Sequence, residues 1–219
     1  MCKQSGNDFC TELGEDVSSW SKVCPLPKPD WINSSLSTFK EVINLAVEGK
    51  VIEAQSLLKD SRDLEMRTWF DIHAQNVGLW RSKAINIEAP RARVPLDTLK
   101  TFGKFEEELF ARDNYRCRYC ASEVFPKKLF KRVQSVVGET FLPLGRTNKT
   151  RSGFHLLAVA TLDHVLPWSL GGRTDPNNLV TCCWSCNYGK ANFTVKQIGI
   201  RNPLDNAQKP SMRASENLR

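Results

Sequence analysis

Two pairs of cysteines constrain this 219-residue chain more than any other feature of its sequence. Each pair has the spacing Cys-x-x-Cys, formed by Cys117 with Cys120 and by Cys183 with Cys186. This spacing lets both sulfurs of a tight turn reach one tetrahedral metal ion, and four thiolates make a closed, structural zinc site. The metal would hold together the two ends of the 62 residues between the pairs. The sequence therefore predicts structural Zn²⁺, with buried free thiols as the alternative.

The other four cysteines show no comparable pairing. Cys182 competes for the metal by adjacency alone, and Cys2, Cys10 and Cys24 stay unassigned thiols. No apolar stretch approaches the roughly 20 residues that a membrane span requires, and the first residues lack the features of a secretory signal. We therefore expect a cytoplasmic protein without membrane contact, in which the cysteines do not form disulfides.

Charge divides the chain into two unlike halves. The whole chain carries a formal net charge of +7, but residues 1–100 have 13 basic and 14 acidic side chains, whereas residues 101–219 have 18 and 10. A basic surface attracts a polyanion such as nucleic acid. We therefore expect phosphate contacts from the second half, and contacts with a partner protein or a second copy of the chain from the first half.

The first half has the hydrophobic patterning of helices. Residues 1–35 are polar and then proline-rich, which predicts an extended arm. Apolar residues then recur at helical spacing over 39–58, with a helix end at Gly49, and again over 63–80. The interpretation is a helical domain and a basic linker over residues 36–95.

The second half mixes helix and strand signals. In chain order they predict a helix from Asp97 to about residue 110, a strand over 154–162, a second strand over 179–181 and a helix over 184–200. The basic segment 121–153 fits a solvated loop and a phosphate clamp equally well. The polar tail 201–219 has too little apolar surface to become ordered.

A series of short motifs accompanies the second cysteine pair. D-H-x-x-P begins at Asp163, a Gly-Gly pair follows, N-L-V begins at Asn178, and C-x-x-C-N-x-x-K begins at Cys183. In this order, the segment from about residue 109 to 198 resembles the HNH endonucleases of the ββα-metal type. The resemblance implies an α+β chain, with an N-terminal helical domain followed by a zinc-stapled ββα-metal (HNH) domain over residues 96–200.

The resemblance also implies roles for single residues. His164 would be the general base that takes a proton from the attacking water. Asp163 and Asn187 would hold one divalent ion, and Mg²⁺ (or Mn²⁺) is favoured because Asn187 offers an oxygen where many members have a histidine. Neighbouring strand residues face opposite sides, so the chain must bend at Asp163 and His164 if both are to reach one phosphate. Asn178 matches the asparagine that fixes the backbone around the base, and Lys190 matches a lysine near the phosphate.

The resemblance implies a metal-dependent HNH endonuclease that hydrolyses phosphodiester bonds in DNA, and by analogy the effector subunit of a phage-defence or restriction system. The predicted nucleic-acid contacts are Lys190, Arg173, Lys127, Lys128, Lys131 and Arg132. His73 and His155 are expected to be structural residues. The alternative is a zinc-stapled nucleic-acid-binding module that does not cut, although a binding module has no use for an intact base and metal pair.

Overall fold

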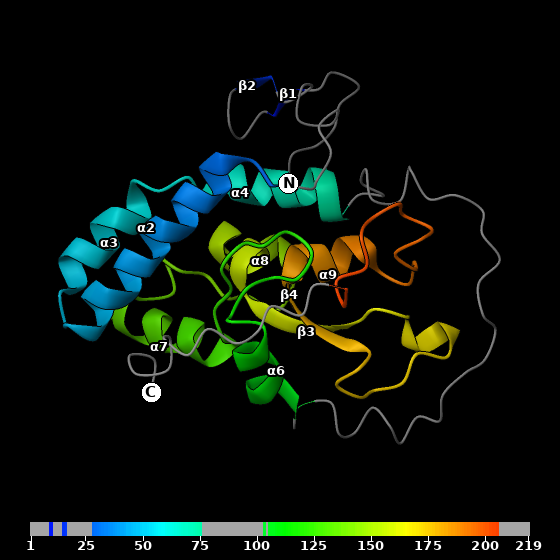
Figure 1. Ribbon diagram of the computed structural model, residues 1–219. Coiled ribbons are helices and arrows are strands. Elements are labelled where there is room, and N and C mark those ends of the chain that lie inside the picture. Colours follow the sequence, from blue (N-terminus) through cyan, green and yellow to red (C-terminus); the bar gives the residue numbers. More distant parts are fainter. Residues whose placement is uncertain (1–8, 11–14, 17–27, 76–102, 104, 206–219) are drawn as a thin grey trace.

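The computed structural model describes residues 9–10, 15–16, 28–75, 103 and 105–205, and Figure 1 labels its main helices and strands. Two short antiparallel strands, β1 (Phe9–Cys10) and β2 (Glu15–Asp16), precede the helical part of the chain. Some predicted features lie outside the described residues. They are most of the predicted arm, the basic part of the linker over 81–95, the tail from residue 206, Cys2 and Cys24.

The N-terminal part of the chain is helical, as predicted. It contains α2 (Asp30–Val47), α3 (Val51–Lys59), α4 (Asp63–Phe70) and the π-helical turn η1 (Asp71–Gln75). Gly49, with a φ of 76°, lies between α2 and α3, which confirms the predicted helix end. The extended arm is wrong for residues 30–35, because they form the first turns of α2. Pro29 is the N-cap residue, and Asp30 adds a negative charge at the positive end of the helix dipole.

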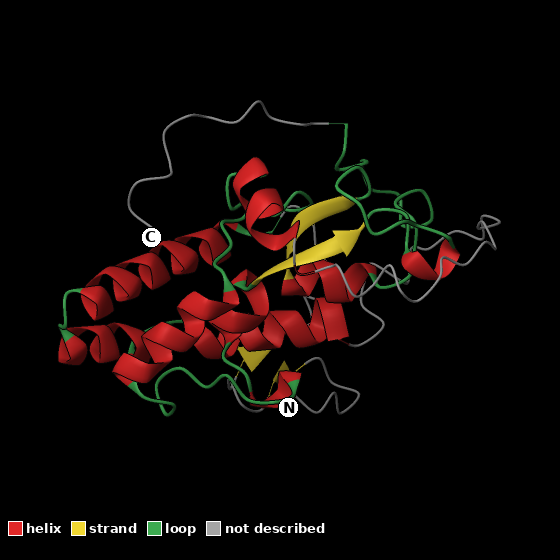
Figure 2. Ribbon diagram, turned by 90° about the horizontal axis from the view of Figure 1, so that it is seen from below, coloured by secondary structure: helices red, strands yellow, loops and turns green. Residues whose placement is uncertain are grey.

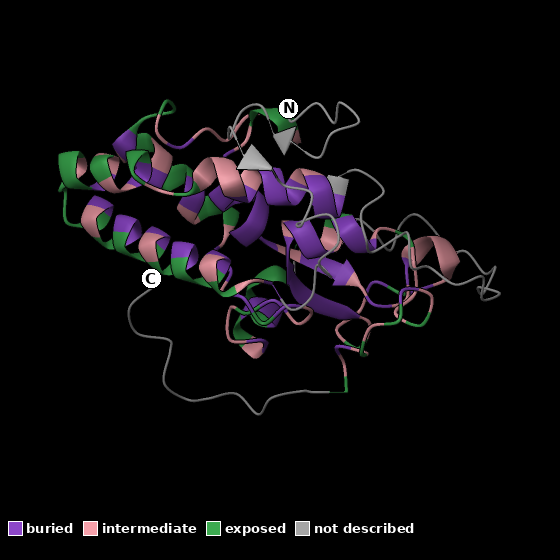
Figure 3. Cartoon of the chain, turned by 90° about the horizontal axis from the view of Figure 1, so that it is seen from above, coloured by how far each residue is buried: buried purple, intermediate pink, exposed green. Residues whose placement is uncertain are grey.

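The N-terminal helices share one hydrophobic core with the middle of the chain. Phe39 of α2 stacks on Phe130 of α7 (Lys127–Val137) and on Phe154 of α8 (Gly153–Ala158), with ring centroids 4.9 Å and 4.8 Å apart. Buried residues of all these helices form a single cluster, and Figure 3 shows them on the inward faces of the helices. The boundary predicted at residue 96 therefore does not separate two hydrophobic cores.

Two segments of the second half are helical against prediction. The basic segment 121–153 contains α7, which buries Phe130 and Val133 and leaves its basic side chains exposed. The run predicted as a strand over 154–162 is helix α8 as far as Ala158. Ser152 caps this helix by accepting a hydrogen bond of 3.1 Å from the backbone N–H of His155. All six residues of α8 are buried, so the sequence lacks the periodicity that would separate a helix from a strand.

A hairpin of two antiparallel strands follows. β3 (Ala160–His164) pairs with β4 (Leu179–Cys183) over its whole length, and α9 (Trp184–Lys190) continues directly from β4. The helix is shorter than predicted, because the backbone after Lys190 turns at Ala191, whose φ is 47°. Figure 2 shows the hairpin beside the helices. The structure confirms the α+β class, with N-terminal helices followed by a ββα unit.

A second hydrophobic cluster surrounds this hairpin. It joins Leu109 of α6 (Glu106–Arg112) to Leu162, Leu179 and the cysteines of the two pairs. Asp113, just after α6, accepts a hydrogen bond of 2.8 Å from the backbone N–H of Thr181 and so fastens α6 to β4. In the described part of the chain, none of the helices combines the length and the apolar character needed to cross a membrane.

Candidate active site and metal centre

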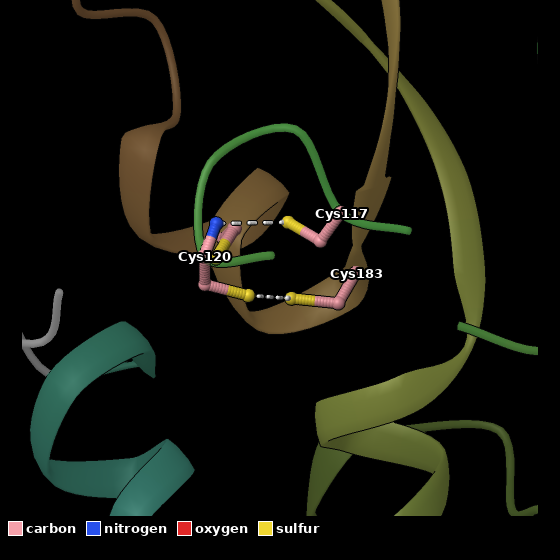
Figure 4. A group of neighbouring side chains, drawn as sticks. Cys117, Cys120 and Cys183 are labelled. Atoms are coloured by element: carbon pink, nitrogen blue, oxygen red, sulfur yellow. Dashed lines mark hydrogen bonds between the residues drawn. The ribbon is translucent and has the colours of Figure 1, made fainter. Parts of the chain in front are cut away.

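The four paired cysteines come together in the structure. Cys117 and Cys120 lie in the loop after α6, Cys183 ends β4, and Cys186 lies in the first turn of α9. All four are buried, and their sulfur atoms lie within 4.8 Å of one another. The sulfurs of Cys120 and Cys183 are 3.9 Å apart, close to the about 3.8 Å expected between two ligands of a tetrahedral zinc ion. Figure 4 shows Cys117, Cys120 and Cys183 turned toward one another. The predicted convergence is confirmed, and the donor set fits structural zinc.

Two side chains of α9 complete the hydrogen bonding of β3. The amide nitrogen of Asn187 donates to the Leu162 carbonyl oxygen at 3.2 Å and to the Thr161 hydroxyl at 3.1 Å. Lys190, one turn later, donates to the His164 carbonyl oxygen at 2.9 Å. Because Nδ2 of Asn187 makes both of its bonds, the carboxamide oxygen is the atom that can bind a cation.

The carboxylate of Asp163 is buried and held by two side chains. Nζ of Lys190 lies 3.0 Å from its Oδ2, and the Tyr119 hydroxyl donates to the same oxygen at 2.6 Å. Burial raises the pKa of Asp163, whereas the charge of Lys190 and the Tyr119 hydrogen bond act in the opposite direction. Asp163 and Thr161 leave the same face of β3, so the carboxylate lies on the side of the strand that Asn187 contacts.

His164 ends β3 and leaves the face opposite to Asp163. The pairing with β4 is regular up to His164 opposite Leu179, so the bend predicted at Asp163 and His164 is wrong, and the chain turns only after the histidine. Nε2 of His164 lies 2.9 Å from the Thr174 hydroxyl. Burial lowers the pKa of His164, and the positive charge of Lys190 lowers it further. Both effects favour the neutral imidazole, which is the form that can accept a proton.

Asn178 fixes the loop that follows His164. Its Oδ1 accepts a hydrogen bond of 2.9 Å from the Leu166 N–H, and its Nδ2 donates at 3.0 Å to the carbonyl oxygens of Leu166 and Arg173. Gly172 permits this close approach, because a Cβ atom at that position would collide with the Leu166 carbonyl and with the Asn178 amide. Asn178 thus determines the path of the backbone next to the histidine.

A cavity of about 440 Å³ lies beside β3. Thr161, Leu162 and Asn187 line it from the ββα unit. The charged residues of its lining are Lys127, Lys128, Arg151, Glu106 and Glu107. The cavity therefore brings the predicted cation ligand Asn187 together with basic side chains of α7.

The predicted nucleic-acid contacts occupy different environments. Four exposed cations lie along α7: Lys127, Lys128, Lys131 and Arg132. Arg173 is exposed in the loop between β3 and β4. Lys190, by contrast, is 0% exposed, with its ammonium group on Asp163 and on the His164 carbonyl. The buried ammonium group of Lys190 thus holds Asp163 in place, and the phosphate contact of this lysine stays a prediction.

Three further residues contact the site although the sequence motifs do not predict a role for them. Tyr119 lies inside the first cysteine pair, and Thr174 lies in the turn after the Gly-Gly pair. Thr161 contacts both Asn187 and Cys182, whose sulfur lies 3.1 Å from the Thr161 hydroxyl and outside the four-cysteine cluster. Each of them contacts a motif residue only in the folded chain: Tyr119 contacts Asp163, Thr174 contacts His164, and Thr161 contacts Asn187.

The other two histidines belong to the core, as predicted. His73 and His155 are buried, and burial lowers the pKa of each to about 4. Among the described residues, none forms a hydrogen bond with either ring nitrogen of His73 or with Nδ1 of His155. His73 packs against Trp69, with ring centroids 3.8 Å apart. Both imidazoles are therefore neutral in the folded protein at pH 7.

Comparison with known families identifies the ββα unit. Residues 157–201 match the family described as HNH endonuclease. Comparisons with curated proteins and with solved structures returned no match. The matched segment contains β3, β4, α9 and the second cysteine pair. Residues 157–201 therefore resemble an HNH endonuclease domain, and the fold places this segment after the N-terminal helices.

Proposed function

We propose that this protein is a metal-dependent endonuclease that hydrolyses phosphodiester bonds in DNA. The observation that supports this most strongly is the match of residues 157–201 to the HNH endonuclease family, because the matched segment contains Asp163, His164, Asn178 and Asn187. All four lie in one continuous unit of strand, loop, strand and helix. In this proposal His164 supplies the base, and Asp163 and Asn187, on the opposite face of β3, supply two oxygen donors.

His164 is the general base of this proposal. Its lowered pKa favours the neutral ring, and Thr174 orients the ring through Nε2. Its position at the end of β3 places it next to the loop that Asn178 holds. A water molecule at the imidazole would lose its proton to the ring and attack the scissile phosphorus in line.

Asp163 and Asn187 are the ligands of the catalytic cation, Mg²⁺ or Mn²⁺. Carboxylate and carboxamide oxygens are hard donors of the kind that these ions accept. The Tyr119 and Lys190 contacts of Asp163 both use Oδ2, and the Thr161 and Leu162 contacts of Asn187 use Nδ2, so Oδ1 of each side chain is the oxygen that would face the ion. When bound, the ion would stabilise the charge that develops on the phosphate and on the leaving oxygen.

The basic residues of α7 are the proposed DNA contacts. Lys127 and Lys128 line the cavity that also reaches Asn187, and Lys131 and Arg132 extend the positive charge along the helix. Phosphate contacts of this kind hold a duplex in register without reading its sequence. Arg173, exposed in the loop after the histidine, is a further proposed contact.

Cleavage of a supercoiled plasmid tests the proposal. Wild-type protein should give relaxed or linear DNA in Mg²⁺ or Mn²⁺ and none in EDTA, and His164→Ala should abolish the product. His73→Leu is the matched control, because it removes a histidine that lies in the core. Full cleavage by His164→Ala would refute the mechanism. DNA binding without any cleavage, under either metal, would instead favour the zinc-stapled binding module.

The N-terminal helices are the proposed site of contact with another protein or a second copy of the chain. Such a contact is expected of the effector subunit of a phage-defence or restriction system. Val47 and Ile52, on either side of the turn between α2 and α3, are 71% and 78% exposed. Two large apolar side chains at one turn favour contact with another protein or a second copy of the chain. Light scattering after size-exclusion chromatography would test self-association, and a monomer at every concentration would exclude a homodimer.

A further inference from the structure

A buried lysine from the start of the helical region reaches the four-cysteine cluster. Nζ of Lys28 lies 3.2 Å from the sulfur of Cys183 and 3.1 Å from the carbonyl oxygen of Leu157, and the residue is only 6% exposed. Lysine is almost never fully buried unless it is paired, because removing an ammonium group from water is costly. A neutral thiol and one carbonyl are weak compensation for that cost, whereas a thiolate cluster is strong compensation.

We infer that Lys28 is a positioning residue of the metal site, which donates a charged hydrogen bond to the metal-bound Cys183 thiolate and anchors the start of α2 to it. The inference rests on the assignment of a metal ion to the four cysteines, and it does not depend on nuclease activity.

The charge of the site supports this role. Four thiolates around a divalent ion carry a formal charge of −2, and the site is buried. The Lys28 ammonium reduces the net charge of this group to −1. Groups that donate hydrogen bonds to metal ligands orient the ligands and tune the metal, so the loss of Lys28 should weaken the metal site itself.

Cys183 is also the best-supported sulfur among the described contacts. Besides Lys28, the Ser185 hydroxyl lies 3.2 Å from the Cys183 sulfur. Cys117 accepts a longer contact of 3.5 Å from the backbone N–H of Cys120. Hydrogen bonding thus concentrates on the cysteine at the junction of β4 and α9, which is also the start of the helix that carries Asn187 and Lys190.

The position of Lys28 in the chain adds a second consequence. Lys28 directly precedes Pro29, the N-cap residue of α2, and α2 contributes Phe39 to the shared core. The metal would therefore join three segments rather than two: the loop of Cys117 and Cys120, the β4–α9 junction, and the start of α2. By linkage, metal binding strengthens the contact of Lys28 with the site by the same factor by which that contact strengthens metal binding.

The test compares Lys28→Met with the wild-type full-length protein. Zinc affinity, measured by competition with a chromophoric chelator at pH 7.4, should fall roughly 10- to 100-fold. In the Co²⁺-loaded protein, the thiolate-to-cobalt charge-transfer band should move to lower energy, because the thiolate loses a hydrogen bond. Lys40→Met, which removes an exposed lysine of α2, is the matched control and should change neither readout.

Two outcomes would overturn the inference. Zinc affinity within twofold of wild type, together with an unchanged cobalt band, would show that Lys28 only packs against the site. Wild-type protein that binds neither ion would remove the metal site altogether, a result read from the wild type alone and separate from the plasmid assay. If Lys28→Met does not fold, Lys28→Gln, which removes the charge and keeps an N–H donor, gives the same two measurements.

Discussion

Nζ of Lys190 lies 3.0 Å from Oδ2 of Asp163, and the two side chains are 0% and 8% exposed. Removing one member of such a pair leaves the other charge buried and unpaired, which costs about 3–5 kcal/mol. We therefore expect Lys190→Met to lower the free energy of unfolding by about 3–5 kcal/mol, measured by urea denaturation. Lys128→Met is the control, because its ion pair with Glu107 is exposed and should contribute less than about 1 kcal/mol. Equal losses in the two variants would refute the structural role of Lys190.

The cations of α7 should set the salt dependence of DNA binding. Replacing Lys127 and Lys128 together by glutamine should weaken binding and reduce the slope of log K against log[salt] by about 1.8, because each phosphate contact contributes about 0.9. Fluorescence anisotropy with a labelled duplex at several salt concentrations, in EDTA, measures both quantities. Lys59→Gln, at the end of α3, should leave the slope unchanged. An unchanged slope in the α7 variant would place the DNA elsewhere.

Gly172 should be intolerant of any side chain. In Gly172→Ala, the new Cβ would collide with the Leu166 carbonyl oxygen and the Asn178 amide, and such overpacking typically costs about 1–3 kcal/mol. We expect lower stability and slower plasmid cleavage, since the loop next to His164 must shift. Gly103→Ala is the control, because among the described residues no atom beyond its chain neighbours lies within 4 Å of its added Cβ. The account fails if both alanine variants behave like wild type.

Acid should destabilise the protein through its buried histidines. The pKa of His73 is about 4 in the folded protein and about 6.5 in the unfolded chain, so the unfolded chain binds the proton first as the pH falls. The contribution of the neutral His73 to the free energy of unfolding is therefore fully present above pH 6.5, and it is lost as the pH falls from 6.5 toward 4. Between pH 7.5 and 5.5, His73 should remove about 1.4 kcal/mol. Urea denaturation of His73→Leu should show a fall that is smaller by this amount; the same fall as in wild type would contradict the prediction.

Substitution of two adjacent cysteines, Cys182 and Cys183, should affect zinc binding differently. Cys183→Ser should lose bound zinc and lower the melting temperature, because it removes one of the four sulfurs of the cluster. Cys182→Ser should retain the zinc, since the Cys182 sulfur contacts Thr161 instead. Zinc content by mass spectrometry and thermal unfolding, with and without a chelator, distinguish the two. Zinc retained in Cys183→Ser would rule out the four-cysteine ligand set.

The parts of the site that the sequence predicted are those in which chemistry fixes residue type and spacing. Two Cys-x-x-Cys pairs have few roles other than metal binding, and the four sulfur atoms do lie close together. Gly49 correctly predicted the end of α2, because a left-handed backbone conformation favours glycine. Lys190 shows the limit of the same reasoning, because its place in a motif did not reveal that its ammonium group faces Asp163 rather than solvent.

The fold around the site was predicted less well, for two physical reasons. The run that becomes α8 and β3 is apolar throughout, so its pattern does not distinguish the two structures. The shared core depends on pairing over long distances in the chain, such as Phe39 with Phe130 and Phe154, and such pairing leaves no local pattern. Lys28 is a similar case, since its acceptor Cys183 lies 155 residues away.

The two edges of the hairpin determine how another protein can approach it. On the β3 edge, the Leu162 and His164 carbonyls accept from Asn187 and Lys190. On the β4 edge, Thr181 donates its N–H to Asp113 and accepts from the backbone N–H of Arg118 at 2.9 Å. A strand from another chain would have to displace these bonds before it could extend the sheet. Recruitment by strand addition is therefore disfavoured, and so is edge-to-edge aggregation, which leaves helical surfaces and loops as the places where other macromolecules bind.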